Sequence, residues 1–219
     1  MPKFEFRLRL GYFLLAAFAI MIGLYPLRFI GLPVENGLLG DKPQHLLNTL
    51  FYVPAFYLHI SLGGIALLAG FTQFFPRLRR KRQGLHRSLG KLYVLAVMIS
   101  GFSGLLIAFF ATGGYISALG FGSLAVLWIY TTFRAYMAIR KHELPSHRRW
   151  MIRSYALCFA AVTLRIYLPL TVMVAGMEFI TAYRMIAWLC WVPNLIAAEY
   201  LIIGNYRSAL QKGKRRSAS

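Results

Sequence analysis

Residues 92–139 read LYVLAVMISGFSGLLIAFFATGGYISALGFGSLAVLWIYTTFRAYMAI, two long apolar runs joined by the short turn Gly113-Gly114-Tyr115. Arg134 is the only charged residue in this stretch. Each run is long enough for a helix to cross a hydrocarbon core about 30 Å thick, which takes about 20 residues. Because the turn between them is so short, we expect two membrane-spanning helices that pack side by side and run antiparallel.

Similar apolar runs fill most of the 219-residue chain, of which 58% is hydrophobic and only 14% is charged. A water-soluble domain of this size needs a more polar surface, so the composition excludes that class. We therefore predict an all-α membrane bundle of six transmembrane helices, in one domain at residues 10–205. A cytoplasmic segment, residues 1–9, precedes it, and a basic cytoplasmic tail, residues 206–219, follows it. The six spans are expected at about residues 10–30, 51–75, 89–112, 119–139, 150–175 and 183–204.

The chain has 25 Lys and Arg but only 6 Asp and Glu, a balance that would indicate nucleic-acid binding in a water-soluble protein. Most of these basic residues lie in the N-terminal segment, the loops after the second and fourth spans, and the tail. The other connections hold only Arg28, Lys42 and Arg184. Because basic connections stay on the cytoplasmic side, this alternation indicates a multi-pass protein of a bacterial inner membrane with both termini in the cytoplasm. It argues against a nucleic-acid partner.

The same basic segments predict contact with the surface of the lipid bilayer. Clusters of Lys and Arg next to a membrane span attract anionic headgroups. We expect this attraction at the loop of residues 77–91 and at the tail.

The chain partly matches itself when it is shifted by 61 residues, so that His86-Arg87 falls on His147-Arg148. Each copy has an apolar helix, a basic loop, the His-Arg pair and a second helix. Two interpretations stay open. One is a duplicated helical hairpin in parallel orientation, and the other is two cytoplasmic loops that look alike because both are basic.

Ionisable side chains within the spans form two layers when depth is counted at about 1.5 Å per helical residue. The outer layer contains His59 and Arg165, and the inner layer contains Arg134 and Glu199. Buried charges need partners, so Arg134 and Glu199 are the expected ion pair, with either a structural or a catalytic role. Glu199 is the only carboxylate inside a predicted span, which makes it the candidate proton carrier.

The His-Arg pairs lie at the cytoplasmic ends of two neighbouring spans. Two imidazoles at one level are the ligand set of a six-coordinate b-type haem, and nearby arginines can neutralise its propionates. A quinone or lipid-headgroup site in the same place, and interfacial anchoring without a cofactor, are the alternatives. No metal other than a haem iron is expected, because His59 lies on the opposite side of the bilayer. The candidate cofactor-binding residues are His86, His147, Arg87, Arg148, Arg149, Tyr93 and Gln73.

Two segments carry a resemblance to a known family. They read HISLGGIALLAGFTQFFPRLRRKRQGLHRSLGKLYV at residues 59–94 and FGSLAVLWIYTTFRAYMAIRKHELPSHRRWMIRSYALCFAAVTLR at residues 121–165. In both residues and spacing they resemble the bacterial predicted-membrane-protein family called domain of unknown function 2306. The resemblance implies a membrane protein and supplies no activity.

Two hypotheses for function follow from these observations. In the first, the protein is redox-linked and binds a b-type haem or a quinone near the cytoplasmic face. In the second, it is a non-enzymatic assembly factor or small transporter whose polar layers only fix the packing of the helices. Loss of a bound chromophore when His86 or His147 is replaced would distinguish the first from the second.

Overall fold

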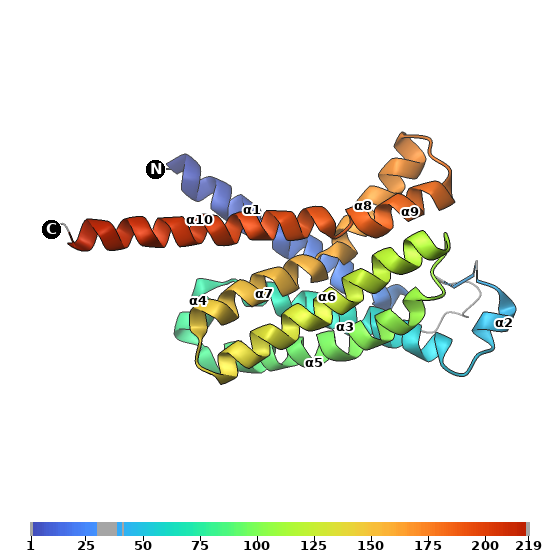
Figure 1. Ribbon diagram of the computed structural model, residues 1–219, viewed down its shortest axis with the longest axis horizontal. Coiled ribbons are helices and arrows are strands. Elements are labelled where there is room, and N and C mark those ends of the chain that lie inside the picture. Colours follow the sequence, from blue (N-terminus) through green and yellow to red (C-terminus); the bar gives the residue numbers. More distant parts are fainter. Residues whose placement is uncertain (1, 30–38, 41, 218–219) are drawn as a thin grey trace.

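The computed structural model describes residues 2–29, 39–40 and 42–217, with side chains between residues 11 and 204 (Figure 1). Residues 1, 30 and 218–219, which belong to the predicted N-terminal segment, first span and tail, lie outside the described residues. So do the basic side chains of that segment and tail. The protein is 84% helical. The elements are α1 (Pro2–Gly23), the 3-10 helix η1 (Tyr25–Phe29), α2 (Gln44–Leu47), α3 (Tyr52–Thr72), α4 (Pro76–Lys81), α5 (Gln83–Ala108), α6 (Tyr115–Arg140), α7 (Leu144–Cys158), α8 (Ala160–Pro169), the π-helix η3 (Leu170–Val174), α9 (Phe179–Leu189) and α10 (Val192–Ser217).

Six segments of the described chain are long and apolar enough to cross a membrane, which confirms the predicted helical membrane bundle. They are Gly11–Phe29, Tyr52–Thr72, Gln83–Ala108, Tyr115–Arg140, Leu144–Val174 and Phe179–Gly204. Two of the helices begin earlier than the apolar runs suggested. Helix α5 starts at Gln83, and α7 starts at Leu144 with Pro145 in its first turn, a position that proline favours because its missing N–H has no helical partner there.

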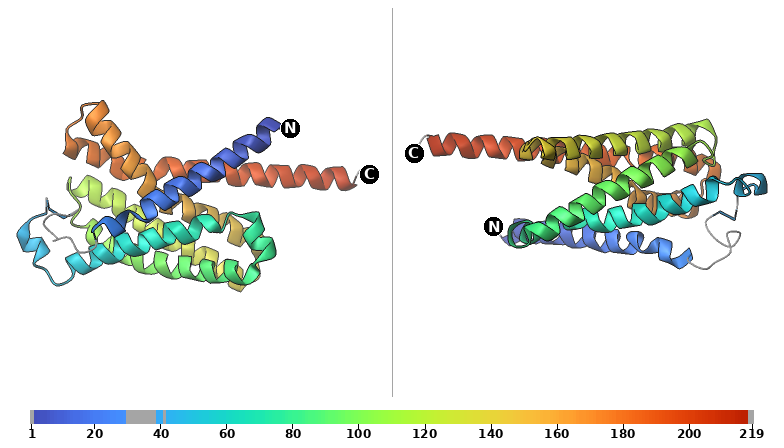
Figure 2. Two further views of the ribbon diagram at one scale, coloured as in Figure 1. Left: turned by 180° about the vertical axis from the view of Figure 1, so that it is seen from behind. Right: turned by 90° about the horizontal axis from the view of Figure 1, so that it is seen from below.

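Helices α3, α5, α6 and α7 form a four-helix core in which α3 packs on α5, α5 on α6, α6 on α7, and α7 back on α3 (Figures 1 and 2). Helix α1 packs against α3, α9 against α6, and α10 against α7. Both termini lie at the end of the molecule that carries α4 and the turn between α6 and α7 (Figure 1). We call this end the basic end, after the arginines and lysines of α4 and that turn. The helix α10 runs without a break from the last span to Ser217, so the predicted tail continues this helix.

The turn between α5 and α6 has the tight form that its glycines predicted. Gly113 and Gly114 adopt positive φ angles of 93° and 73°, which glycine reaches without the strain of a side chain. Two cations hold this turn in place. Arg184 donates from Nε to the Gly113 carbonyl at 2.7 Å, and Lys42 donates from Nζ to the Phe110 carbonyl at 2.8 Å. Helices α5 and α6 are therefore the antiparallel neighbours that the sequence indicated.

The last two spans are each broken, a feature that the apolar runs did not reveal. The fifth is interrupted at Phe159, between α7 and α8, and the sixth at Cys190 and Trp191, between α9 and α10. Pro193 follows the second break and lacks the N–H that would continue the hydrogen bonding of α9. Helices α8 and α9 are separated by these breaks from α7 and α10, and they project from the four-helix core, which α9 still contacts at α6 (Figures 1 and 2).

Asn194 connects the two breaks. Its Nδ2 group lies 3.0 Å from the Cys190 carbonyl, 2.9 Å from the Thr163 hydroxyl and 3.3 Å from the Ala156 carbonyl, so its two N–H groups are shared among three acceptors. Carbonyls that lose their helical partners need other donors inside a membrane. The amide of Asn194 supplies them and ties the fifth span to the sixth.

Helix α9 begins with an N-cap that makes its order sensitive to pH. The Glu178 carboxylate accepts hydrogen bonds from the N–H groups of Ile180 and Thr181, both at 2.8 Å, and these hold the pKa of Glu178 below its ordinary value. A carboxyl whose pKa is lowered by folding stabilises the fold above the unfolded pKa, and this contribution is lost as the pH falls through the folded pKa.

We therefore expect Glu178→Gln to lower the thermal stability of the protein at neutral pH and to have progressively less effect at acidic pH. The measurement is the melting temperature of the detergent-purified protein and the variant across this range. A difference between the two proteins that stays constant with pH would contradict the assignment of Glu178 as an ionised cap.

Candidate functional site

Two imidazoles lie close together at the basic end of the four-helix core. His86 lies in the first turn of α5 and His147 in the first turn of α7. The charge of His147 is near enough to act on His86, as are those of Arg79 and Arg87. We call His86 and His147 the imidazole pair. They are separated by the 61 positions of the internal repeat, so the two copies of the motif meet across the core.

The two imidazoles differ in how their ring nitrogens are used. His147 Nδ1 lies 2.8 Å from the Ala135 carbonyl and therefore carries the proton, which leaves Nε2 as the lone-pair nitrogen. His86 Nδ1 is buried and has no hydrogen-bond partner among the described residues. A buried nitrogen without a protein partner is unusual, and it marks His86 as a candidate for contact with a bound group.

Small and polar residues lie near His86. A Cβ atom added at Gly90, one turn along α5 from His86, would meet only the Gln73 side-chain oxygen within 4 Å, at 3.4 Å. Gln73 Nε2 donates to the Thr72 hydroxyl at 3.1 Å. Tyr93, further along α5, is fully buried.

The arginines predicted beside the imidazole pair divide into two groups. Arg87 and the unpredicted Arg79 act on His86 through their charge. Arg148 and Arg149 follow His147 on α7 and are exposed. All four arginines are exposed, and the charges of Arg79 and Arg87 are near enough to act on His86.

A chain of buried hydroxyl groups crosses the core below the imidazole pair. Tyr93 Oη lies 2.7 Å from Ser154 Oγ, which lies 2.6 Å from Thr132 Oγ1, and Thr132 donates to the Trp128 carbonyl at 2.7 Å. Each hydroxyl has one proton to donate. Because Thr132 gives its proton to the carbonyl, Ser154 must donate to Thr132 and Tyr93 must donate to Ser154. The hydrogen bonds between these hydroxyl groups therefore all run in one direction, from Tyr93 toward the Trp128 carbonyl.

Tyr93 and Ser154 are also separated by 61 positions. Two pairs of equivalent residues thus meet across the core, the imidazole pair and this hydroxyl pair. A duplicated hairpin would bring equivalent residues of its two copies together in this way.

We expect Tyr93→Phe to lower the free energy of unfolding by about 1–2 kcal/mol, because a buried hydrogen bond is lost while Ser154 keeps Thr132 as its acceptor. Tyr115→Phe is the control, since the Tyr115 side chain is 89% exposed. Unfolding in mixed micelles with increasing SDS measures both. Equal stability of the two variants would show that the hydroxyl chain contributes nothing.

His59 and Arg165, the residues of the predicted outer polar layer, each have partners of their own in the structure. His59 on α3 and Ser100 on α5 bind each other twice, through His59 Nδ1 and the Ser100 carbonyl at 2.9 Å and through Ser100 Oγ and the His59 carbonyl at 2.8 Å. Arg165 donates to the Ala161 carbonyl at 3.0 Å and lies over the Tyr25 ring at 4.8 Å. Each polar group in this layer has a partner within the protein.

The expected ion pair of Arg134 with Glu199 is wrong, because Glu199 binds Arg153 in the structure. Arg153 on α7 binds both carboxylate oxygens of Glu199 on α10, at 2.5 and 2.8 Å. Arg153 lies near the start of the predicted fifth span, residues 150–175, and depth alone did not single it out as the partner. Since α7 starts at Leu144, Arg153 lies on the helix and faces α10.

Arg134 lies on α6 beside Trp150 instead. Its guanidinium carbon is 4.9 Å from the centre of the Trp150 ring, and its Nη1 donates to the Tyr130 hydroxyl at 3.0 Å. The Arg153 guanidinium carbon also lies over the Trp150 ring, 4.7 Å from its centre. Trp150 thus contacts both arginines, but only Arg153 reaches the carboxylate.

The described residues contain no cluster of three or more His, Cys, Asp or Glu side chains that could hold a metal ion by themselves. In the imidazole pair, the Ala135 carbonyl orients the His147 ring, and His86 has a buried nitrogen without a partner among the described residues.

Comparison with known proteins gives one match. No curated protein and no solved structure is significantly similar to the chain. The model of one family, described as a predicted membrane protein, matches residues 56–202, which extends beyond the segments that carried the resemblance in the sequence. This match covers most of the chain, including the imidazole pair and the four-helix core, so the protein belongs to the DUF2306 family of predicted membrane proteins.

Proposed function

We propose that this membrane protein is a redox protein that holds a b-type haem between His86 and His147. The observation that carries the proposal is the imidazole pair itself, in which the Ala135 carbonyl orients the His147 ring and His86 Nδ1 is buried with no hydrogen-bond partner among the described residues. A haem bound there would supply one-electron transfer, and the protein would set its potential through the ligands and their surroundings.

The chain's own residues would hold the group in three ways. The Ala135 carbonyl fixes the ring orientation of His147 and raises the basicity of its free nitrogen. Arg79 and Arg87 supply positive charge for carboxylate substituents at the basic end. Tyr93 and the hydroxyl chain close the core on the other side and keep water from entering along it.

Glu199 remains the candidate proton carrier, but the structure sets a condition on that role. Both of its oxygens accept hydrogen bonds from Arg153, which keeps the carboxylate in its ionised form. A proton can therefore reach Glu199 only when this ion pair opens. Transfer through Glu199 would then be coupled to a movement of α10 relative to α7.

A quinone headgroup is the second candidate for the same site. It is favoured by the space beside Gly90, where a flat ring could lie against the helix, and by the Gln73 amide next to it. His86 would then use its buried nitrogen to bind a carbonyl oxygen of the ring. Quinone extracted in stoichiometric amount from a colourless purified protein would favour this occupant over haem.

We also propose the bacterial inner membrane as the location, with the basic end in the cytoplasm, because positive connections stay on that side. Residues 77–91 include α4 and its exposed arginines and would then face the anionic headgroups of the inner leaflet. Proteolysis of oriented vesicles at α4 tests this orientation, which predicts cleavage only from the cytoplasmic side.

The test of the haem proposal is the haem content of His86→Leu and His147→Leu, purified from cells supplied with haem. His142→Asn is the control, because His142 lies in the turn before α7 with a φ of 61°, which asparagine tolerates. We expect near-stoichiometric haem in the wild type and control and almost none in the other two variants. Helical circular dichroism and elution volume show whether each variant has folded.

Haem retained in both leucine variants would overturn this assignment. A folded wild-type protein without haem would overturn the proposal as a whole. In that case the imidazole pair would have a structural role in packing, as the non-enzymatic hypothesis states. Addition of imidazole to His147→Gly gives an independent check, since it should restore binding only if His147 is a ligand.

A further inference from the structure

Arg134 is a cation inside a membrane span without a carboxylate partner among the described residues. It precedes Arg140, the last residue of α6, by about 9 Å along the helix. Its side chain is exposed, and Glu199, its expected partner, is bound by Arg153. An arginine at this depth is unfavourable unless an anion or a polar interface neutralises it. Something outside the chain must therefore complete its environment.

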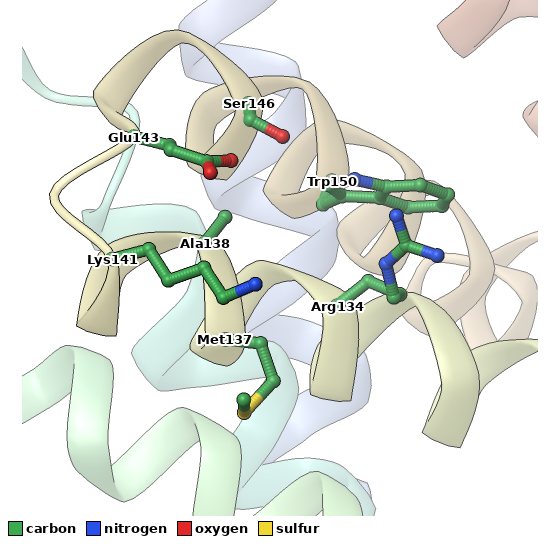
Figure 3. A pocket seen from close by; sticks show the side chains of 7 residues that line it. All are labelled: Arg134, Met137, Ala138, Lys141, Glu143, Ser146 and Trp150. Carbon is green, nitrogen blue, oxygen red and sulfur yellow. The ribbon is translucent and has the colours of Figure 1, made fainter.

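A surface pocket of about 250 Å³ opens where this guanidinium lies, between the end of α6 and the first turns of α7 (Figure 3). Arg134 and Lys141 line it from two sides. The Lys141 ammonium points into the pocket, and the Arg134 guanidinium lies against the Trp150 ring at the other side (Figure 3). The Ser146 hydroxyl and the Glu143 carboxylate lie along its upper edge as drawn. The pocket thus combines two cations, one anion and one neutral hydrogen-bonding group.

We propose that this pocket binds the phosphodiester of a membrane phospholipid headgroup. Two cations and one carboxylate leave one positive charge, which a phosphate monoanion neutralises. Arginine binds phosphate oxygens with two parallel donors, and lysine adds a point charge beside it. The carboxylate of Glu143 would accept a hydrogen bond from the hydroxyl or ammonium group at the outer end of the headgroup.

Trp150 makes the pocket suited to the membrane interface. Its indole ring lies 4.9 Å from the Arg134 guanidinium carbon and contacts Tyr130 edge-on. Tryptophan and tyrosine prefer the headgroup region, where an apolar ring meets polar groups. The stacked ring holds the guanidinium in place, so less side-chain freedom is lost when phosphate binds. This pocket is separate from the imidazole pair and does not depend on a haem.

The same phosphate chemistry could come from a small soluble phosphate. The location favours a lipid, because the pocket opens on the outer surface of the spans at interfacial depth. A soluble phosphate would be displaced from it by excess inorganic phosphate, whereas a lipid is also held by its acyl chains along the helices. This difference separates the two sources.

Native mass spectrometry of the full chain, delipidated in detergent and titrated with palmitoyl-oleoyl phosphatidylglycerol, tests the proposal. The variant is Arg134→Gln with Lys141→Gln. The control is Arg80→Gln with Lys81→Gln, which removes the same charge from exposed positions of α4, where the attraction to anionic headgroups is expected to be diffuse and to hold no single lipid tightly. We expect one tightly held lipid in the wild type and control, and an affinity about 10–30 times weaker in the pocket variant. Excess inorganic phosphate should leave the wild-type adduct in place.

Three results would overturn the proposal. Equal weakening in the pocket variant and the control would show only diffuse attraction to basic residues. Unchanged binding in the pocket variant would exclude the site. Displacement of the lipid by inorganic phosphate would assign the pocket to a soluble phosphate. Arg134→Lys provides a second variant if the double replacement fails to fold, and it should weaken binding because a lysine keeps the charge but loses the two parallel donors.

Discussion

Replacing Gly120 by alanine will lower the free energy of unfolding by about 1–3 kcal/mol, because the added methyl group has no space between α6 and α9. Its Cβ would stand 2.8 Å from the Ala187 carbonyl oxygen and 2.9 Å from the Ala187 Cβ. Both atoms belong to, or are fixed by, the backbone of α9. The helix itself must move away, since no side chain can rotate to make room.

Gly122→Ala on the same helix is the matched control. Only Leu105 Cδ1 comes near its Cβ, at 4.0 Å, so nothing needs to shift. Alanine favours a helix over glycine by about 1 kcal/mol, and this variant should be neutral or slightly more stable. Unfolding in mixed micelles with SDS measures both. If the two variants lose the same stability, α9 does not pack against α6 at Gly120.

Separating Arg153 from Glu199 will have the next largest effect. The guanidinium binds both carboxylate oxygens, and removal of either partner leaves the other charge without compensation. Glu199 is 42% exposed, so we discount the effect for screening and expect a coupling of about 1–2 kcal/mol. The measurement is a double-mutant cycle with Arg153→Gln and Glu199→Gln.

The parallel cycle with Arg134→Gln and Glu199→Gln distinguishes the observed ion pair from the one that depth alone predicts. Arg134 binds Tyr130 and Trp150 and has no contact with Glu199 in the structure. Its coupling to Glu199 should therefore be close to zero. A larger coupling for Arg134 than for Arg153 would restore the original pairing.

The membrane class and the six spans could be predicted from the sequence because the length of an apolar run is what the bilayer selects. The breaks at Phe159 and Cys190 could not, since apolar residues continue through both. Pro193 indicates the second break, but proline is also tolerated within transmembrane helices. The Asn194 contacts that satisfy the broken hydrogen bonds depend on α7 and α8, which are remote in the sequence.

The candidate site was predicted in part. The equal spacing of His86 and His147 indicated that they are equivalent, and the structure brings them together. Thr132 was missed, because a hydroxyl residue in a span often bonds only to its own helix and gives no distinct signal. The predicted partner of Glu199 was wrong because depth gives only a level along a helix. Which side chain at that level reaches the carboxylate depends on which helices pack together, and α10 packs against α7, which carries Arg153.

Whether the imidazole pair binds haem is tested most directly by the absorption spectrum of the purified wild-type protein. The protein should be prepared in detergent from haem-replete cells and measured oxidised and then reduced with dithionite. We predict a sharp α-band in the reduced spectrum at near-stoichiometric haem, as two imidazole ligands require. A folded, colourless protein under these conditions would contradict the claim.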